Sequence, residues 1–342
     1  RRVLFRSHHL GYMEQTSFYN SKSKTVMNAW IRPNHPFIYQ TLIAVLIILC
    51  FATLLFSIWK KIKPSPLVSE MLTRTYSWWG MSTIVALIVL LHPALGVTFL
   101  SIISLSAFRE LSSMSKNIRA ADRNIIIWCY LAIPVQFAWA YLQNFHGFIT
   151  FIPVFMFIWI PIMLVMKGET QDIGKSMSVL PGELMLTVFS ISHLAYMLTI
   201  PISPQLLAGG SGMVLYVLFL TEMNDVFQFC WGKVFGKHKI VPKVSPNKTW
   251  EGLIGGFITT SILGYALGFL TPFGKYMIWI VPAILSIAGF IGDVMVSAIK
   301  RDVGVKDTGN LIPGHGGLMD RIDSLLLTSV VFFHIYYALY HG

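Results

Sequence analysis

Long apolar runs, separated by short polar breaks, follow one another along the chain from residue 37 to residue 340. Most of these runs approach the ~20 residues that an α-helix needs to cross the hydrocarbon core of a bilayer. The pattern predicts an all-α, polytopic integral membrane protein with about ten transmembrane helices. We place the spans at residues 37–59, 78–92, 94–110, 124–142, 146–166, 181–202, 208–231, 252–270, 276–299 and 318–340.

The break between the second and third spans contains His92 and Pro93. Proline lacks a backbone donor and interrupts a helix. This dipeptide is therefore either a tight turn between two short helices or a kink in one long segment.

The composition supports the membrane assignment. Hydrophobic residues make up 55% of the 342 residues and charged residues only 12%, whereas a soluble domain contains about 25% charged residues. The mean hydropathy is +0.65, and the short polar breaks leave no room for a separate soluble domain. Cys50, Cys129 and Cys230 lie in or at the ends of apolar runs without metal-ligand spacing, so we interpret them as small core residues.

The net charge of +11 raises the question of a nucleic-acid partner. In the predicted layout, however, nearly all the basic loop residues lie on one side of the membrane. The loops on one side of the predicted layout contain Lys275 as their single basic residue. By the positive-inside rule the other side is cytoplasmic, which places both termini outside and requires no nucleic acid. That basic side contains Lys60, Lys61, Lys63, Arg74, Arg109, Lys116, Arg119, Arg123, Lys167, Lys175, Lys233, Lys237, Lys239, Lys243, Lys248, Lys300, Arg301, Lys306 and Arg321.

We divide the chain into three parts. Residues 1–36 form an N-terminal extension, and its first seven residues, RRVLFRS, resemble the translation of a sequencing adapter, so this part is partly an artefact and is left out of the fold argument. Residues 37–200 form the N-terminal transmembrane helices. Residues 201–342 form a C-terminal catalytic transmembrane region, because the residues that carry chemistry lie there.

Charged residues gather around the last two spans, where charge is costly and marks a functional site. On a helix, Asp293, Ser297 and Lys300 stand at i, i+4 and i+7 on one face. Asp320 and Asp323 stand at i and i+3 where the next span begins. The basic, glycine-rich loop between them lets backbone amides approach a phosphate closely. This set suits a metal ion bridged to an anionic ligand, and the alternative is ordinary snorkelling of charges at the interface.

From Ser297 to Asp323 the chain reads S-A-I-K-R-x4-K-D-x5-P-G-H-G-G-L-M-D-R-I-D. This run resembles the signature of the phosphatidate cytidylyltransferases, also called CDP-diacylglycerol synthases. A match of this length is far too long for chance.

A second block lies at the seventh predicted span. Asp225 stands in the apolar run with Glu222 and Gln228 at i−3 and i+3 on its face. A glycine–basic loop follows, and then the run S-P-N-K-T-W-E-G from Ser245 to Gly252. This block also resembles the family, and the two blocks cover the C-terminal third of the chain. The departures from the family pattern are Gln228, Phe229, Lys233 and Phe290.

The acids of the two blocks are predicted to lie at the same depth in the membrane. Asp225 and Asp293 each lie about six residues before the cytoplasmic ends of their spans, which is about 9 Å at helical rise. Asp320 and Asp323 begin the last span from the same side. We therefore expect all four acids at one level, just under the cytoplasmic surface.

The resemblance implies the transfer of CMP from CTP to phosphatidic acid, with release of pyrophosphate and formation of CDP-diacylglycerol in phospholipid biosynthesis. It implies Mg²⁺ as the cofactor, with a second cation as an option. It also implies a multi-pass protein of the inner (plasma) membrane, whose active site faces the cytoplasm at the ends of the C-terminal spans. The expected partners are CTP, phosphatidic acid, membrane lipid and, as a further option, a second copy in a homodimer.

The site residues implied by the resemblance fall into three groups. As metal ligands we expect Asp293 and Asp320 first, then Asp323 and Asp225. As further catalytic residues, most of which would hold phosphates, we expect Lys300, Arg301, Lys306, Asp307 and His315. As substrate-binding residues we expect Asp225, Lys237, Ser245, Lys248, Thr249, Glu251, Ser297, Gly316, Gly317 and Arg321.

Some residues keep two interpretations. Thr249 is equally suited to cap the eighth span. Ser297 has no adjacent base that would make it a nucleophile, so we expect it to donate a hydrogen bond. Gly252, together with Gly255 and Gly256, is better explained by close helix packing than by ligand contact.

Two other functions remain open. A CTP-dependent isoprenoid-alcohol kinase would share the membrane setting and the nucleotide, but it would release CDP instead of pyrophosphate. A cation-coupled transporter would also place acids in the membrane, although near its midplane, and it leaves the glycine-rich basic loop without a purpose.

Overall fold

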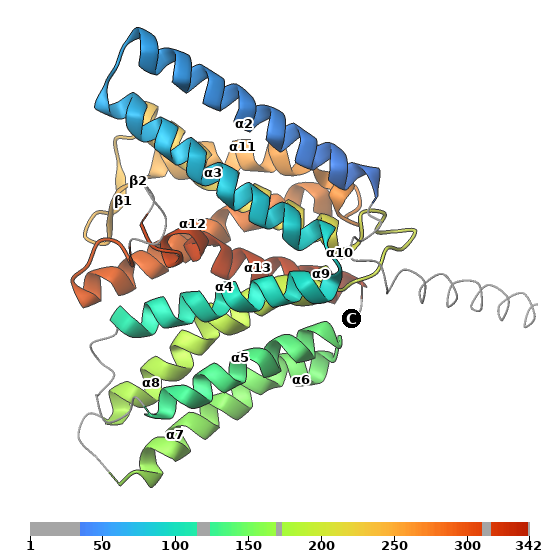
Figure 1. The fold of residues 1–342 in the computed structure, drawn as a ribbon, viewed down its shortest axis with the longest axis vertical. Coiled ribbons are helices and arrows are strands. Elements are labelled where there is room, and N and C mark those ends of the chain that lie inside the picture. The colour runs from blue at the N-terminus through green and yellow to red at the C-terminus, as the bar shows by residue number, and fades with distance from the viewer. Residues whose placement is uncertain (1–34, 115–123, 169–172, 310–315, 341–342) are drawn as a thin grey trace, which may run out of the picture.

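The computed structural model describes residues 35–114, 124–168, 173–309 and 316–340. Within these ranges the chain forms long helices that run side by side, with one small hairpin (Figure 1). The elements are α2 (Pro36–Ile62), α3 (Pro66–Leu90), α4 (Pro93–Met114), α5 (Ile126–Tyr141), α6 (Phe145–Thr150), η2 (Phe151–Met156), α7 (Phe157–Met166), α8 (Ile173–Leu184), η3 (Met185–Phe189), α9 (Ser190–Leu198), α10 (Gly209–Phe235), β1 (Lys239–Val241), β2 (Ser245–Thr249), α11 (Trp250–Ala266), η4 (Gly268–Leu270), α12 (Met277–Val303) and α13 (Met319–Tyr340).

The prediction of an all-α membrane protein is confirmed at the level of fold class. Each predicted span falls on a helical segment of the structure. In the described part of the chain, seven helical segments are long and apolar enough to cross a membrane, and the total of about ten spans stays a prediction. The seven segments are Pro36–Ile62, Pro93–Met114, Phe145–Met166, Ile173–Leu198, Gly209–Phe235, Met277–Val303 and Met319–Tyr340.

Helix α3, which contains the second predicted span, begins earlier than predicted, and a turn separates its end from α4. The side chain of Ser65 accepts a hydrogen bond from the Val68 amide at 3.3 Å, and Pro66 occupies the first helical position, which together form a helix start signal. At the other end, the Ala94 amide donates to Nδ1 of His92 at 3.3 Å between α3 and α4. The interpretation of this break as a tight turn is confirmed, and the interpretation as a kink is wrong.

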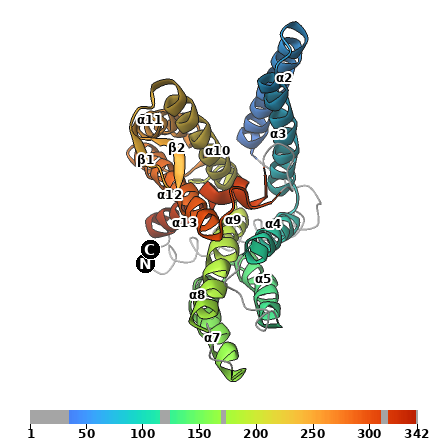
Figure 2. The ribbon, with the colours of Figure 1, turned by 90° about the vertical axis from the view of Figure 1, so that its left-hand side faces the viewer.

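Large apolar side chains cover much of the outer surface. On α2 alone, Ile47, Phe51 and Leu54 are more than half exposed. A contiguous apolar surface of this size is costly in water, and lipid tails would cover it. Figures 1 and 2 show α2 and α3 as an antiparallel pair at one edge of the molecule, where lipid can reach them.

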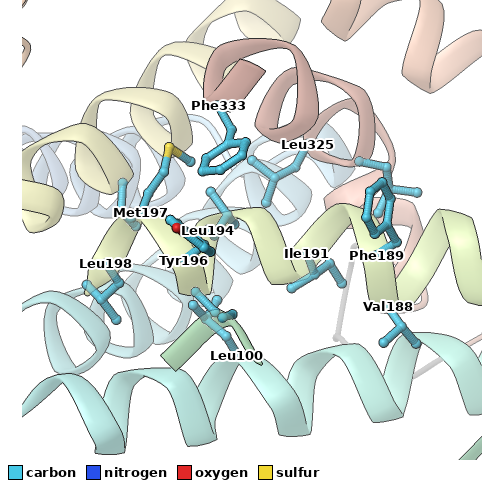
Figure 3. Packing of buried hydrophobic residues seen from close by; sticks show 14 of the residues in the cluster. Leu100, Val188, Phe189, Ile191, Leu194, Tyr196, Met197, Leu198, Leu325 and Phe333 are labelled. Atoms are coloured by element: carbon cyan, nitrogen blue, oxygen red, sulfur yellow. The ribbon is translucent and has the colours of Figure 1, made fainter. Parts of the chain in front are cut away.

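The segment from α8 through η3 to α9 runs through the centre of the molecule. Every residue of α9 is buried. Figure 3 shows this segment between Leu100 of α4 and Phe333 of α13. His193 lies in the same core with its ring against Phe148 and Phe333, which agrees with its interpretation as a structural residue.

Glycines allow the four C-terminal helices α10, α11, α12 and α13 to approach closely. A Cβ atom on Gly252 would lie 2.7 Å from the carbonyl oxygen of Gln228, and one on Gly292 would lie 2.8 Å from that of Asp323. Both distances are shorter than ordinary van der Waals contact. The interpretation of Gly252 as a packing residue is therefore confirmed.

The hairpin of β1 and β2 was not predicted. The strands are antiparallel, with Lys239 opposite Thr249 and Val241 opposite Ser245. They are short and show no alternation of apolar and polar residues, so the pattern that identifies a strand is missing. Strand β2 packs against α10, α11 and α12, and this placement brings Lys248 over the ends of the C-terminal helices.

Candidate active site

A cavity of ≈ 310 Å³ lies where β2 and α10 meet the facing ends of α12 and α13. The four predicted acids of these helices line it together, in agreement with the depth argument. Its lining contains more acidic than basic side chains. The lining residues are Asp225, Gln228, Phe229, Ser245, Asn247, Lys248, Thr249, Gly252, Leu253, Asp293, Lys300, Asp307, Asp320, Arg321 and Asp323.

Lys248 reaches from β2 into the group of carboxylates. Its Nζ lies 2.7 Å from Oδ2 of Asp293 and 4.0 Å from Oδ1 of Asp225, and it donates to Oε1 of Gln228 at 3.3 Å. Burial by itself would lower the pKa of Lys248, but the carboxylates of Asp293 and Asp225 raise this pKa above its usual value. The lysine therefore stays charged and partly balances the acids.

Asp225, Asp293 and Asp323 come from three different helices and are within electrostatic reach of one another. The Ser324 hydroxyl donates to Oδ2 of Asp225 at 2.7 Å, and the Ser324 amide donates to Oδ1 of Asp323 at 2.8 Å. Oδ1 of Asp225 is buried and has no hydrogen-bond partner among the described residues. This oxygen can accept a further donor or ligate a cation.

The three carboxylates do not form a closed cage for a metal ion. In the described ranges, no three or more His, Cys, Asp and Glu side chains are grouped so that they alone could hold one. Mg²⁺ at phosphate sites usually takes one or two carboxylates and completes its shell with water and substrate oxygens. Asp225, Asp293 and Asp323 fit such an ion, because the buried Oδ1 of Asp225 is an available oxygen donor.

Asp320 has partners that differ from the prediction. Its Oδ1 accepts a hydrogen bond from Nζ of Lys300 at 2.8 Å. Its Oδ2 accepts from the Thr308 amide at 2.8 Å and the Gly317 amide at 3.0 Å, and the hydroxyl oxygen of Thr308 lies 3.0 Å from it. A carboxylate has about four lone-pair sites, and these donors take both sites of Oδ2 and one of the two sites of Oδ1. Asp320 orients Lys300 and organises the loop, and its role as a first-choice metal ligand stays a prediction.

Arg321 lines the cavity from the first turn of α13. Its Nε is buried and has no hydrogen-bond partner in the described part of the chain. An arginine in this state can donate to a phosphate oxygen, which agrees with its prediction as a substrate-binding residue.

Several predicted site residues lie away from this lining. The guanidinium of Arg301 is exposed and donates to the carbonyl oxygens of Val244 and Val305 at 3.2 and 3.0 Å. The hydroxyl of Ser297 donates to Oδ1 of Asp293 at 3.2 Å, which is the hydrogen bond expected of it. His315 and residues 1–34 lie outside the described residues. The predicted residues that do not line the cavity are Lys237, Glu251, Ser297, Arg301, Lys306, Gly316 and Gly317.

Glu251 holds the connection between α10 and β1. It accepts hydrogen bonds from the amides of Lys237 and His238 at 3.1 and 3.2 Å, and Nδ1 of His238 lies 2.6 Å from its Oε1. The His238 side chain, helped by backbone amides, lowers the pKa of Glu251 to about 2. Thr249 accepts from the Gly252 amide at 3.1 Å and so caps α11. Both residues support the hairpin, and Thr249 lines the cavity as well.

Sequence reasoning missed some residues. Asn247 and Leu253 line the cavity but lie beside the predicted residues of the same block. Phe229 was noted only as a departure from the family pattern, and Gln228 was placed on the face of Asp225 but not proposed as a site residue. Glu110, on α4, hydrogen-bonds to the loop between α12 and α13. Its only signal in the sequence is that it is an isolated acid at the start of a basic loop.

Comparison with known proteins extends the resemblance along the chain. A sequence profile described as the Cytidylyltransferase family matches residues 72–339. The match therefore begins within α3, far upstream of the two blocks that carried the resemblance.

Individual relatives agree with this profile. A protein of Escherichia coli (strain K12), named "Uncharacterized protein YnbB", is 38% identical over 297 residues, which cover 86% of this chain and 95% of the relative. A phosphatidate cytidylyltransferase of Rickettsia bellii (strain RML369-C) is 32% identical over 193 residues, covering 54% of this chain and 80% of the relative. A phosphatidate cytidylyltransferase of Staphylococcus haemolyticus (strain JCSC1435) is 41% identical over 119 residues, covering 34% and 46%.

Proposed function

Because this chain belongs to the cytidylyltransferase family and is a nucleotidyltransferase, we propose that it is a phosphatidate cytidylyltransferase of phospholipid biosynthesis. In this reaction a phosphate oxygen of phosphatidic acid attacks the α-phosphorus of CTP. The bond to the β-phosphate breaks, pyrophosphate leaves, and CDP-diacylglycerol forms. The relatives from Rickettsia and Staphylococcus that are named for this reaction support the assignment.

The observation that carries the proposal is the charge of the cavity and its place in the fold. Asp225, Asp293 and Asp323 face Lys248 at the ends of apolar helices. Both proposed substrates are anions, and a lining with surplus acids would repel them unless a cation completed it. The position at helix ends, beside lipid-facing surfaces, suits one water-soluble and one lipid substrate.

In this proposal Asp225, Asp293 and Asp323 hold Mg²⁺, with a second cation as an option. The bound ion would neutralise phosphate oxygens and favour attack at phosphorus. The second pKa of a phosphate monoester is about 6, so the attacking oxygen is already ionised at neutral pH. The chain therefore needs no strong general base.

The basic side chains of the cavity have separate tasks in the proposal. Lys300 is fixed by Asp320 before any substrate binds, so it is preorganised to hold a phosphate. Arg321 offers a buried Nε that lacks a protein partner among the described residues. Lys248 can exchange its contact with Asp293 for a phosphate oxygen, because its ammonium group ends a flexible four-carbon side chain that lines the cavity.

We also propose that the cavity faces the cytoplasm and that about ten helices cross the inner (plasma) membrane. The support is the basic character of the loops at the cavity end, where Lys233, Lys239 and Lys243 are exposed. In this layout α3, α5 and α11 are spans in addition to the seven segments that are long and apolar enough to cross a membrane.

The test is to follow label from CTP into products with the purified protein, phosphatidic acid and Mg²⁺. Label in the α-phosphate should enter the lipid, and label in the γ-phosphate should leave as pyrophosphate. Asp293→Asn should lose this activity, whereas Asp302→Asn, an exposed acid on the same helix, should retain it. Transfer of the γ-label to a lipid alcohol would indicate a kinase, and no transfer to any lipid would overturn the proposal.

A further inference from the structure

Glu110 lies near the C-terminal end of α4, and its carboxylate contacts the segment between α12 and α13. Oε2 accepts a hydrogen bond from the Leu318 amide at 2.9 Å, and Oε1 accepts one from the Met319 amide at 3.4 Å. The hydroxyl of Thr308 also donates a short hydrogen bond to Oε1. One side chain of the N-terminal helices therefore joins both flanks of the loop that follows α12.

The two amides that Glu110 accepts belong to the N-terminal end of α13. The first amides of a helix have no partner within the helix, and the helix dipole favours a carboxylate beside them. Asp320, in the first turn, accepts the amides of Thr308 and Gly317. The amides of Gly317, Leu318 and Met319 are therefore committed to carboxylates of the protein and are not left for a phosphate.

Thr308 connects Glu110 with the cavity. The hydroxyl that donates to Glu110 also lies 3.0 Å from Oδ2 of Asp320, and Oδ1 of Asp320 holds Lys300. Thr308, Asp320 and Lys300 are all buried. In a buried network the position of each member depends on its neighbours, so a change at Glu110 reaches the ammonium group of Lys300.

Gly317 provides independent evidence that this contact is a close one. A Cβ atom on Gly317 would overlap Oε1 of Glu110 and the hydroxyl oxygen of Thr308. Its amide donates to Asp320. The lack of a side chain at Gly317 therefore permits the close approach of Glu110, and the role of Gly317 in substrate binding stays a prediction.

We propose that Glu110 is a positioning residue for the cavity. It does not line the cavity and acts by fixing the start of α13 and Thr308, so that Lys300 and Asp323 stand at the phosphates. Its effect on catalysis rests on the proposed function, whereas its effect on the loop does not. Through Glu110 of α4, the N-terminal helices help to position the residues that line the cavity.

The first test measures amide hydrogen exchange of the full chain in detergent micelles. In Glu110→Gln and Glu110→Ala, peptides that contain Leu318 and Met319 should exchange about 10- to 100-fold faster, because hydrogen bonds to a charged acceptor are lost. Arg109→Gln is the matched control, since Arg109 is the exposed neighbour on the same helix. Equal exchange in the Glu110 variants and in this control would overturn the proposal.

The second test measures turnover of CTP and phosphatidic acid per folded molecule. We expect Glu110→Gln to lower kcat/KM by about 10- to 100-fold. Thr308→Val should have a similar effect, and the double variant should be little worse than either single variant, because both act through one network. A loss that merely follows the folded fraction, or two fully additive losses, would overturn the positioning role.

The two tests separate the two proposals. If the wild-type chain does not convert CTP and phosphatidic acid, the proposed function fails, and the exchange experiment still decides whether Glu110 holds the start of α13. If turnover is present but the exchange of Leu318 and Met319 does not respond, the Glu110 proposal fails alone.

Discussion

Replacing Asp320 by asparagine should destabilise the fold, whereas the same replacement at Asp293 should leave the fold intact and remove turnover. Both substitutions preserve the size of the side chain and remove one negative charge. The sequence gives both aspartates the same expected role and so predicts the same outcome for both. In the structure they line the same cavity but have different partners.

The magnitude follows from the ion pair that each aspartate makes. Asp320 and Lys300 are each 8% exposed, and Nζ of Lys300 lies 2.8 Å from Oδ1 of Asp320. Removing one partner of a buried ion pair lowers the free energy of unfolding by about 3–5 kcal/mol. The side chain of Asp293 is 21% exposed, and after its replacement Lys248 still has Asp225 at 4.0 Å. We therefore expect about 0–1 kcal/mol for Asp293→Asn.

Turnover per folded molecule should fall more in Asp293→Asn than in Asp320→Asn, which is the opposite order to that of the stability losses. Asp293 contributes charge directly to the cavity, and groups aimed at developing charge contribute about 10²–10³-fold to kcat. Asp293→Asn should lose at least this much. In Asp320→Asn, part of the loss of total activity should disappear once turnover is calculated per folded molecule.

The assay is unfolding by sodium dodecyl sulfate in mixed micelles, followed by tryptophan fluorescence, with turnover measured at each folded fraction. Asp302→Asn is the control, because Asp302 is exposed on the same helix as Asp293. Wild-type stability in Asp320→Asn would refute the reasoning. A loss of about 3 kcal/mol or more in Asp293→Asn would refute it equally, because that is the size expected for a buried pair.

Three further predictions follow from the geometry. Turnover should require Mg²⁺ and stop with a chelator, and equal rates in both conditions would contradict the assignment of Asp225, Asp293 and Asp323. A membrane-impermeant thiol reagent should label Gln205→Cys and Lys243→Cys, both at exposed positions, from opposite sides of the membrane, and labelling from one side would contradict the predicted orientation. The stabilising effect of Glu251, measured against Glu251→Gln, should be constant above about pH 5 and decline as the pH falls from its unfolded pKa of about 4.3 toward its folded pKa of about 2; a difference that grows on acidification would contradict it.

The apolar pattern alone determined most of the helices. A run of about 20 apolar residues has one stable form in a bilayer, because every backbone donor must be satisfied within the segment. Each of the ten predicted spans therefore coincides with a helical segment. The ends were less certain, as Ser65 and Pro66 show, because capping depends on a few polar residues that the hydropathy pattern does not weigh.

The sequence also identified the residues that gather at the cavity, since acids in apolar runs are rare and costly. Asp225, Asp293, Asp320 and Asp323 line it together. Their individual partners could not be predicted. Asp293 and Asp320 were both expected as first metal ligands, yet one contacts Lys248 and the other Lys300.

Only the tertiary structure decided these pairings, because they join elements that are distant along the chain. Lys248 reaches Asp293 through a hairpin whose short polar strands carry no periodic signal. Glu110 reaches the start of α13 from the third predicted span, and no local pattern relates the two. A buried carboxylate must find donors wherever the packed helices place them, so its partner is a property of the assembled fold and not of the neighbouring sequence.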